Sequence, residues 1–188
     1  MNLPNKLTVA RILLVPVFMA FATLSAARGT GIWYLLAGIV FAAASITDLL
    51  DGRIARSRGL VTDFGKFADP LADKILTTTA FIYMLVEGVC HPVVLVLVLF
   101  REFAVSGLRM VAAGSKDGRV IAANMWGKVK TAVQMVSIVF FYFARGFWPE
   151  AGAVVTVAKL LCWLCAALTV ISGVKYFADN RHFIAETK

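Results

Sequence analysis

The chain has 188 residues, of which 60% are hydrophobic and 16% are charged, and its formal net charge is +8. With a mean hydropathy of +0.82, it carries too little charge to cover the surface of a soluble domain of this length. The basic residues form no dense patch interleaved with aromatic residues, so we expect no nucleic-acid partner. In a membrane protein, a basic excess is more typical of topology and of contact with anionic lipid.

Six apolar stretches are each about 20 residues long, the length that spans a bilayer. In chain order they cover Thr8–Ala27, Gly31–Arg56, Lys66–Gly88, Pro92–Ala113, Gly127–Phe147 and Ala153–Phe177. The connections between them are short and carry Gly, Pro or charged residues. We therefore expect an all-α fold, a polytopic membrane protein with six transmembrane helices in a single domain over residues 1–188.

Basic residues indicate the orientation of these helices, because Lys and Arg are enriched in cytoplasmic loops. With the N-terminus inside, most basic residues fall on the cytoplasmic side, whereas Arg28 and Arg145 fall outside. Arg101, Arg109 and Lys159 remain within the predicted helices. We expect a multi-pass protein of the cell membrane with both termini in the cytoplasm.

Histidine and cysteine chemistry is not favoured by this sequence. His91 and His182 are its two histidines, and Cys162 and Cys165 form a Cys-x-x-Cys within an apolar stretch. A zinc site usually needs four ligands, and a redox site needs a polar entrance. We expect these cysteines to be packing residues.

Four carboxylates, Asp48, Asp51, Asp69 and Asp73, fall within a short window of the chain. The first pair is three residues apart and the second pair four, so each pair shares one helix face. At about 1.5 Å of rise per residue, both pairs lie about 25 to 28 Å from the outer ends of their helices. Because a bilayer core is about 30 Å thick, both pairs reach the cytoplasmic boundary, where two antiparallel neighbours bring them face to face.

Four facing carboxylates repel one another unless cations lie between them. Without His or Cys nearby, all-oxygen ligation favours Mg²⁺ or Mn²⁺, and two ions about 4 Å apart suit such a cluster. The alternative is a solvated helix end in which the acids pair with Arg53, Arg56, Lys66 and Lys74. That alternative suits a single aspartate better than four at this spacing, so we expect a metal site.

The residues between the acids indicate room for a ligand. Gly52 and Ala55 continue the acidic stripe with almost no side chain, so a bulky group can approach the helix closely. Arg56 ends the stripe with a guanidinium suited to phosphate. Thr62 or Asp63 is expected to cap the third helix.

The pattern Asp48-x2-Asp51-Gly52-x2-Ala55-Arg56-x8-Gly65-x3-Asp69-x3-Asp73 resembles the signature of the CDP-alcohol phosphatidyltransferases. Six spans and cytoplasmic termini also resemble that family, and the resemblance implies a homodimer with its active site at the cytoplasmic face. It further implies that Asp48, Asp51 and Asp69 hold the metals, and that Asp73 is the general base and a further metal ligand. The residues implied in binding CDP-diacylglycerol are Gly52, Ala55, Arg56 and Thr62, with Asn5 and Thr8 from an N-terminal segment that lies along the membrane surface before the first helix.

Two further segments, residues 2–11 and residues 101–109 followed by 127–131, resemble the branch of this family whose acceptor is glycerol 3-phosphate. The implied reaction joins CDP-diacylglycerol and sn-glycerol 3-phosphate to give phosphatidylglycerophosphate and CMP, a step of phospholipid biosynthesis. Cations near the cytoplasmic ends of the fourth and fifth helices are candidates for the acceptor phosphate. We expect Arg109 and Lys130 to bind it, with Arg101 and Lys128 as alternates.

Three other functions fit parts of the pattern. The same family also uses other acceptors, such as inositol phosphate, serine or phosphatidylglycerol. A divalent-cation transporter carries acids within its membrane helices, but here the acids cluster at one face and nothing comparable continues outward. A membrane scaffold leaves the eight-position pattern unexplained.

Overall fold

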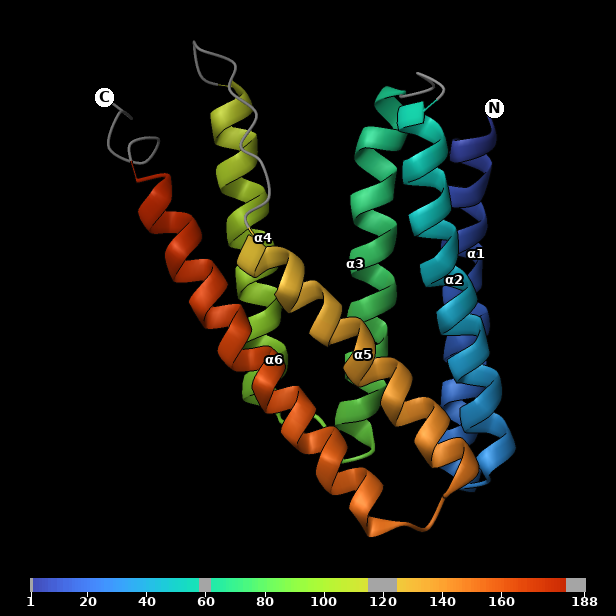
Figure 1. Cartoon of the computed structure of the whole chain (residues 1–188). Helices are drawn as coiled ribbons and strands as arrows, with labels where there is room; N and C mark the ends of the chain where they lie inside the picture. Colours follow the sequence, from blue (N-terminus) through green and yellow to red (C-terminus); the bar gives the residue numbers. More distant parts are fainter. Residues whose placement is uncertain (1, 58–61, 115–124, 182–188) are drawn as a thin grey trace.

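The computed structural model describes residues 2–57, 62–114 and 125–181, and the side chains of residues 3, 4, 49–57, 63, 64, 66, 67, 113 and 114 lie outside this description. Every element in the described residues is an α-helix, which confirms the predicted fold class (Figure 1). The helices are α1 (Leu3–Arg28), α2 (Gly31–Ser57), α3 (Asp63–Val86), α4 (Pro92–Gly114), α5 (Met125–Phe147) and α6 (Gly152–Asp179).

The first helix begins earlier than the sequence predicts. Asn2 caps α1, because its side-chain oxygen accepts a hydrogen bond from the backbone N–H of Asn5 at 3.2 Å. A proline in the first turn loses no hydrogen bond there, since these N–H groups have no partner within the helix. Residues 3–11 are therefore the first turns of α1 and not the separate segment along the membrane surface that the sequence analysis expected.

Three helical stretches of the described chain are long and apolar enough to cross a membrane: Asn5–Arg28, Gly31–Asp48 and Gly152–Asp179. They belong to α1, α2 and α6. The charged residues of α3, α4 and α5 interrupt the apolar stretches of these helices. The chain is a membrane protein by these stretches, and the full count of six spans stays a prediction.

Aromatic packing holds α1, α2 and α5 together in the interior. The ring of Phe18 lies 5.3 Å from that of Tyr142 and 6.0 Å from that of Phe41, and all three are buried. The edge-on geometry of the closer pair is the favoured one for aromatic side chains. From this core the packing continues from α5 to α6 and from α6 to α4, while α3 packs mainly on α1.

The bundle is open at one end. The helices α3 and α4 follow each other directly and meet at the end where α3 finishes, but they stand apart at the opposite end, with α5 crossing between them in Figure 1. The start of α1 and the end of α6 lie at this open end too. The carboxylate pattern on α2 and α3 is therefore placed where the bundle opens.

Candidate active site

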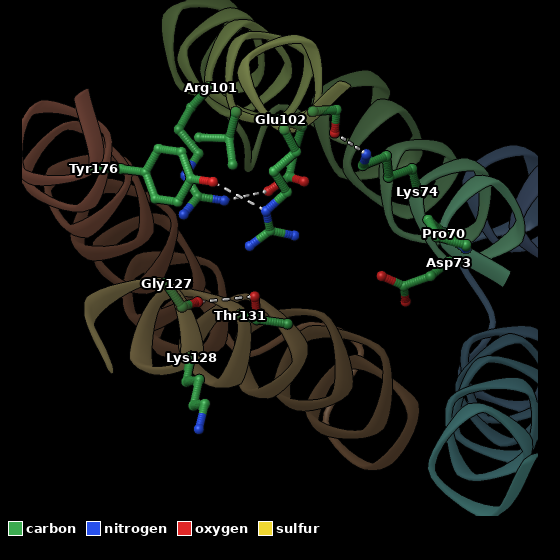
Figure 2. A pocket seen from close by; sticks show the side chains of 12 residues that line it. Pro70, Asp73, Lys74, Arg101, Glu102, Gly127, Lys128, Thr131 and Tyr176 are labelled. Carbon is green, nitrogen blue, oxygen red and sulfur yellow. Dashed lines mark hydrogen bonds and ion pairs between the residues drawn. The ribbon is translucent and has the colours of Figure 1, made fainter. Parts of the chain in front are cut away.

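At the open end, the described residues line a cavity of about 430 Å³ with walls from α3, α4, α5 and α6 (Figure 2). Most of its lining is polar or charged. These side chains are Asp73, Lys74, Arg101, Glu102, Ser106, Arg109, Lys128, Thr131 and Tyr176. A concave site with convergent charged groups is the arrangement expected of an active site.

Polar residues spaced three apart on α1 hold the carboxylates of α2 and α3. Asn5, Thr8 and Arg11 share one helix face, and all three are buried. The Nη1 atom of Arg11 lies 2.9 Å from Oδ1 of Asp48, and the hydroxyl of Thr8 donates a hydrogen bond to Oδ1 of Asp69. One face of α1 thus fixes an aspartate from each of the two helices.

The start of α3 is fixed against α1 by a second contact. Thr62 caps α3, as predicted, because its hydroxyl oxygen accepts from the N–H of Gly65 at 3.0 Å. The same hydroxyl donates to Oδ1 of Asn5 at 2.9 Å. A Cβ added at Gly65 would lie 3.2 Å from Oγ1 of Thr62 and 3.3 Å from Oδ1 of Asn5, so a glycine allows α1 and α3 to approach here.

Asp73 projects from α3 into the cavity, as Figure 2 shows. The negative charges of Asp48 and Glu102 lie within electrostatic reach of its carboxylate, as do the positive charges of Arg11 and Lys130. Asp73 therefore stands between the aspartates held by α1 and the basic side chains of the opposite wall.

The structure describes three of the four predicted aspartates and brings Asp48, Asp69 and Asp73 to the same end of α2 and α3. The surroundings of Asp51, Gly52, Ala55 and Arg56 lie outside what the structure describes. Among the described side chains, no three Asp, Glu, His or Cys residues stand close enough to share one ion. The available donors are nonetheless oxygens, which is the donor set that Mg²⁺ and Mn²⁺ prefer.

Glu102 is the centre of the cavity's charged wall on α4. Its Oε1 atom lies 2.7 Å from Nζ of Lys130 and 3.2 Å from Nη1 of Arg101. Lys130 also donates to Oε1 of Gln134 at 2.5 Å, and its side chain is only 1% exposed. Lys130 therefore lies behind the cavity and supports Glu102, whereas Arg101 reaches the cavity itself.

The remaining basic residues lie on the rim and the far wall. Nε of Arg109 donates to the hydroxyl of Tyr176 at 3.1 Å, and its guanidinium lies 5.7 Å from the centre of that ring. Nζ of Lys74 donates to Oγ of Ser106 at 2.5 Å and so links α3 to α4 beside the cavity. Lys128 is exposed at the start of α5 and points away from the other labelled side chains in Figure 2.

Comparison with known proteins identifies the family. A family model of the CDP-alcohol phosphatidyltransferases matches residues 1–171. The chain belongs to the CDP-alcohol phosphatidyltransferase family. It is 40% identical over 187 residues to a CDP-diacylglycerol--glycerol-3-phosphate 3-phosphatidyltransferase of Bacillus subtilis (strain 168), with 95% of each chain covered.

Two further relatives carry related names. One, from Rickettsia felis, has the same name as the Bacillus protein and is 38% identical over 188 residues, with 97% of each chain covered. The other, from Mycobacterium tuberculosis (strain ATCC 25618 / H37Rv), is named "Probable phosphatidylglycerophosphate synthase" and is 40% identical over 182 residues, covering 94% of this chain and 80% of that protein. These matches confirm the resemblance that the carboxylate pattern indicated.

In this member of the phosphatidyltransferase family, sequence reasoning assigned no role to two residues that shape the site. Arg11 holds Asp48, and Tyr176 orients Arg109. A signal for Arg11 was available, because it continues the three-residue spacing of Asn5 and Thr8 on an otherwise apolar helix. Tyr176 lies 67 residues from Arg109, and no local pattern indicates that contact.

The contact between Lys130 and Glu102 is expected to contribute to the stability of the fold. Lys130→Met removes the closer of the two cations that contact Oε1 of Glu102 and leaves that carboxylate poorly compensated. The loss should lower the free energy of unfolding by about 3 kcal/mol. Lys128→Met, at an exposed position on the same helix, should change it by less than about 0.5 kcal/mol. Denaturant unfolding of the purified protein in detergent measures both. The double variant Lys130→Met/Glu102→Gln should recover part of the loss, and equal losses in the single and double variants would contradict the pairing.

Proposed function

We propose that this chain transfers a phosphatidyl group from CDP-diacylglycerol to sn-glycerol 3-phosphate, giving phosphatidylglycerophosphate and CMP. The observation that carries the proposal is the cavity at the open end, which places Asp73 opposite Arg101 and Arg109. The names of the relatives support both substrates. A carboxylate that accepts a proton and cations that bind phosphate are the groups that this transfer requires.

The proposed metal site lies beside the cavity, and Asp73 is the member of it that lines the cavity. We propose that Asp48, Asp51, Asp69 and Asp73 bind Mg²⁺ or Mn²⁺, in two positions. Such ions neutralise the pyrophosphate of the donor and the charge on the leaving CMP. In the protein, Arg11 and Thr8 hold Asp48 and Asp69 in place, so these two oxygen donors are oriented before any ligand arrives.

Asp73 is the proposed general base. It faces the cavity, and its carboxylate would take the proton from the glycerol hydroxyl as the oxygen attacks the phosphorus that bears the diacylglycerol. The new P–O bond joins glycerol 3-phosphate to the phosphatidyl group, and the P–O bond to CMP breaks. The proton therefore ends on Asp73 and the negative charge on CMP.

The residues proposed to bind the CDP part of the donor are Gly52, Ala55, Arg56 and Thr62, with Asn5 and Thr8 from α1. Asn5 and Thr8 are buried against the start of α3, where they contact Thr62 and Asp69. Their proposed contribution to CDP binding is therefore to position these α3 residues. Thr62 already uses its hydroxyl in the cap, so its role would combine capping with the shape of the nucleotide site.

The acceptor phosphate would bind on the opposite wall. Arg109 lines the cavity with its guanidinium oriented by Tyr176, and Arg101 lies nearby on the same helix. Lys128 is available at the rim. Lys130 would act indirectly, through Glu102, because its amine is buried and already bonded.

Orientation and assembly complete the proposal. The start of α1 and the end of α6 both lie at the open end, which supports a topology with both termini on one side of the membrane (Figure 1). The basic residues favour the cytoplasm for that side. Polar substrates would enter there while the lipid tails stay in the bilayer of the cell membrane. We also propose a homodimer, on the family resemblance.

An acceptor panel tests the proposed reaction. Purified protein in detergent with CDP-diacylglycerol and Mg²⁺ should release CMP with glycerol 3-phosphate and at most weakly with inositol phosphate, serine or phosphatidylglycerol, and removal of divalent ions by a chelator should stop the release. CMP release that depends on another acceptor would keep the family and reject this substrate. Metal flux into proteoliposomes without CMP release would favour a cation transporter instead.

Asp73→Asn should remove the proton acceptor while keeping the size of the side chain. We expect turnover to fall at least about 100-fold, the lower end of what general-base catalysis contributes, with CDP-diacylglycerol binding largely kept. Asp179→Asn, at an exposed position near the end of α6, is the matched control and should leave turnover unchanged. Steady-state CMP release and equilibrium binding of the lipid measure the two effects, and near-normal turnover in Asp73→Asn rejects the assignment of the base.

Arg109→Ala should raise the KM for glycerol 3-phosphate about 10-fold or more, the effect of losing a charge-assisted contact to phosphate, with a smaller effect on the KM for the lipid. Lys175→Ala removes an exposed cation from α6 and should change neither value. The readout is initial rates with each substrate varied in turn. If both KM values rise equally in Arg109→Ala, the cavity has no dedicated site for the acceptor phosphate.

A further inference from the structure

A second hollow lies beside the active-site cavity, between α4 and α6. It has a volume of about 430 Å³, and apart from Arg101 its lining is almost entirely apolar. Leu97 and Phe100 form its α4 side, and Val170, Val174 and Phe177 form its α6 side. Phe100 and Val174 are 70% and 67% exposed, so this apolar groove opens on the outer surface of the bundle.

Arg101 forms the wall between the two hollows, because it lines both of them. Its stem packs against α6, where a Cβ added at Gly173 would lie 3.4 Å from Cγ of Arg101. Its Nη1 atom contacts Glu102 on the cavity side. The side chain of Arg101 is only 12% exposed, and its Nε atom is buried with no hydrogen-bond partner among the described residues.

A buried guanidinium N–H without a partner is costly unless a ligand oxygen completes it. The neighbouring surfaces then restrict the ligand, since one side of Arg101 is polar and the other is apolar. An amphiphile with an anionic head and a hydrocarbon tail satisfies both sides. A free phosphate would leave the groove empty, and an apolar partner would leave Nε without an acceptor.

We propose that the groove between α4 and α6 holds one acyl chain of the lipid donor, with Arg101 binding a head-group oxygen where the chain leaves the cavity. The inference rests on the proposed function, because the phosphorus that reacts must lie in the cavity next to this wall. The exposed rim lets the far end of the chain continue into the bilayer. Since the acyl chain moves from the apolar bilayer into an apolar groove, the groove contributes little to the affinity for the lipid. It acts mainly by aligning the phosphorus with Asp73.

The chain offers a matched pair of substitutions on α6. Val170 lines the groove and Ile171, the next residue, does not, yet both are 46% exposed. Val170→Trp should fill the groove, whereas Ile171→Trp should add the same side chain to the surface outside it. Steady-state rates are measured in detergent with CDP-diacylglycerol of long acyl chains and with a short-chain analogue.

Misalignment of the reacting atoms lowers rates steeply. Val170→Trp should therefore lower kcat/KM for the long-chain donor about 10-fold, with less than about a twofold change for the short-chain analogue. The KM for glycerol 3-phosphate should not change, and Ile171→Trp should leave all three values unchanged. Equal losses with both donors, or equal effects of both variants, overturn the groove assignment.

A second measurement uses the unaltered protein and does not depend on how Val170→Trp folds. A CDP-diacylglycerol with a diazirine in one acyl chain should label peptides of α4 and α6 that contain Leu97 or Val170. Labelling confined to other helices overturns the proposal, as does the same labelling by a diazirine phosphatidylcholine at equal concentration, which would show a site for bulk lipid. A change from dimer to monomer in Val170→Trp alone would assign the groove to a second copy of the chain.

Different results would reject the proposed function and the groove assignment. If the unaltered protein releases no CMP with either donor, the reaction itself is rejected. If the protein is active and both donors respond alike to Val170→Trp, the reaction stands and the groove assignment is rejected.

Discussion

A guanidinium with no solvent exposure, that of Arg11, pairs with Asp48, and the geometry of the open end depends on this contact. A buried charge without a partner costs several kcal/mol, so the pair fixes the register between α1 and α2. Thr8, three residues earlier on the same face, fixes Asp69 of α3 in the same way. The helices α2 and α3 contact each other far less than each contacts α1, so α1 sets the distance between their aspartates.

The predicted metal-binding aspartates and the arginines proposed for the acceptor lie on different helices, and this arrangement suits the transfer of a phosphate group. The aspartates lie on α2 and α3, whereas the basic residues Arg101 and Arg109 lie on α4. One cation, Arg11, lies among the aspartates, where it pairs with Asp48. Arg101 and Arg109 stand apart from that group on α4. Glu102 and Tyr176 hold these arginines in the opposite wall, so an anionic acceptor can bind there without contact with the carboxylates.

Much of the fold follows from local features of the sequence. The apolar stretches and their short connections place the helices to within a few residues, and the spacing of the acids places them at one end. The start of α1 could not be predicted in this way, because its polar residues look exposed until Asp48, Asp69 and Thr62 are seen to cover them. A polar stretch before an apolar run indicates a surface segment unless its partners are known.

The site was predictable to a lesser extent, for a related reason. Charge and position near the cytoplasmic helix ends selected Lys130 along with Arg109 as candidates for the acceptor phosphate. Burial separates them, because Glu102 lies 28 residues before Lys130 in sequence and meets it only where long side chains of α4 and α5 reach each other. Sequence patterns therefore find the charged residues of such a site, but the contacts between helices decide which of them face the ligand.

The position of Arg101 follows from its side chain having two chemically different parts. Its aliphatic stem can lie against Gly173 and the apolar groove while its guanidinium reaches the polar cavity, which is how long basic side chains behave at apolar boundaries. A lysine would offer one point charge at the end of its stem, whereas arginine offers donors along its fork, with Nη1 turned to Glu102 and Nε turned elsewhere. A substrate that is part lipid and part nucleotide meets the same boundary at its phosphate. The residue that separates the two hollows is thus suited to bind the atom group that separates the two parts of that substrate.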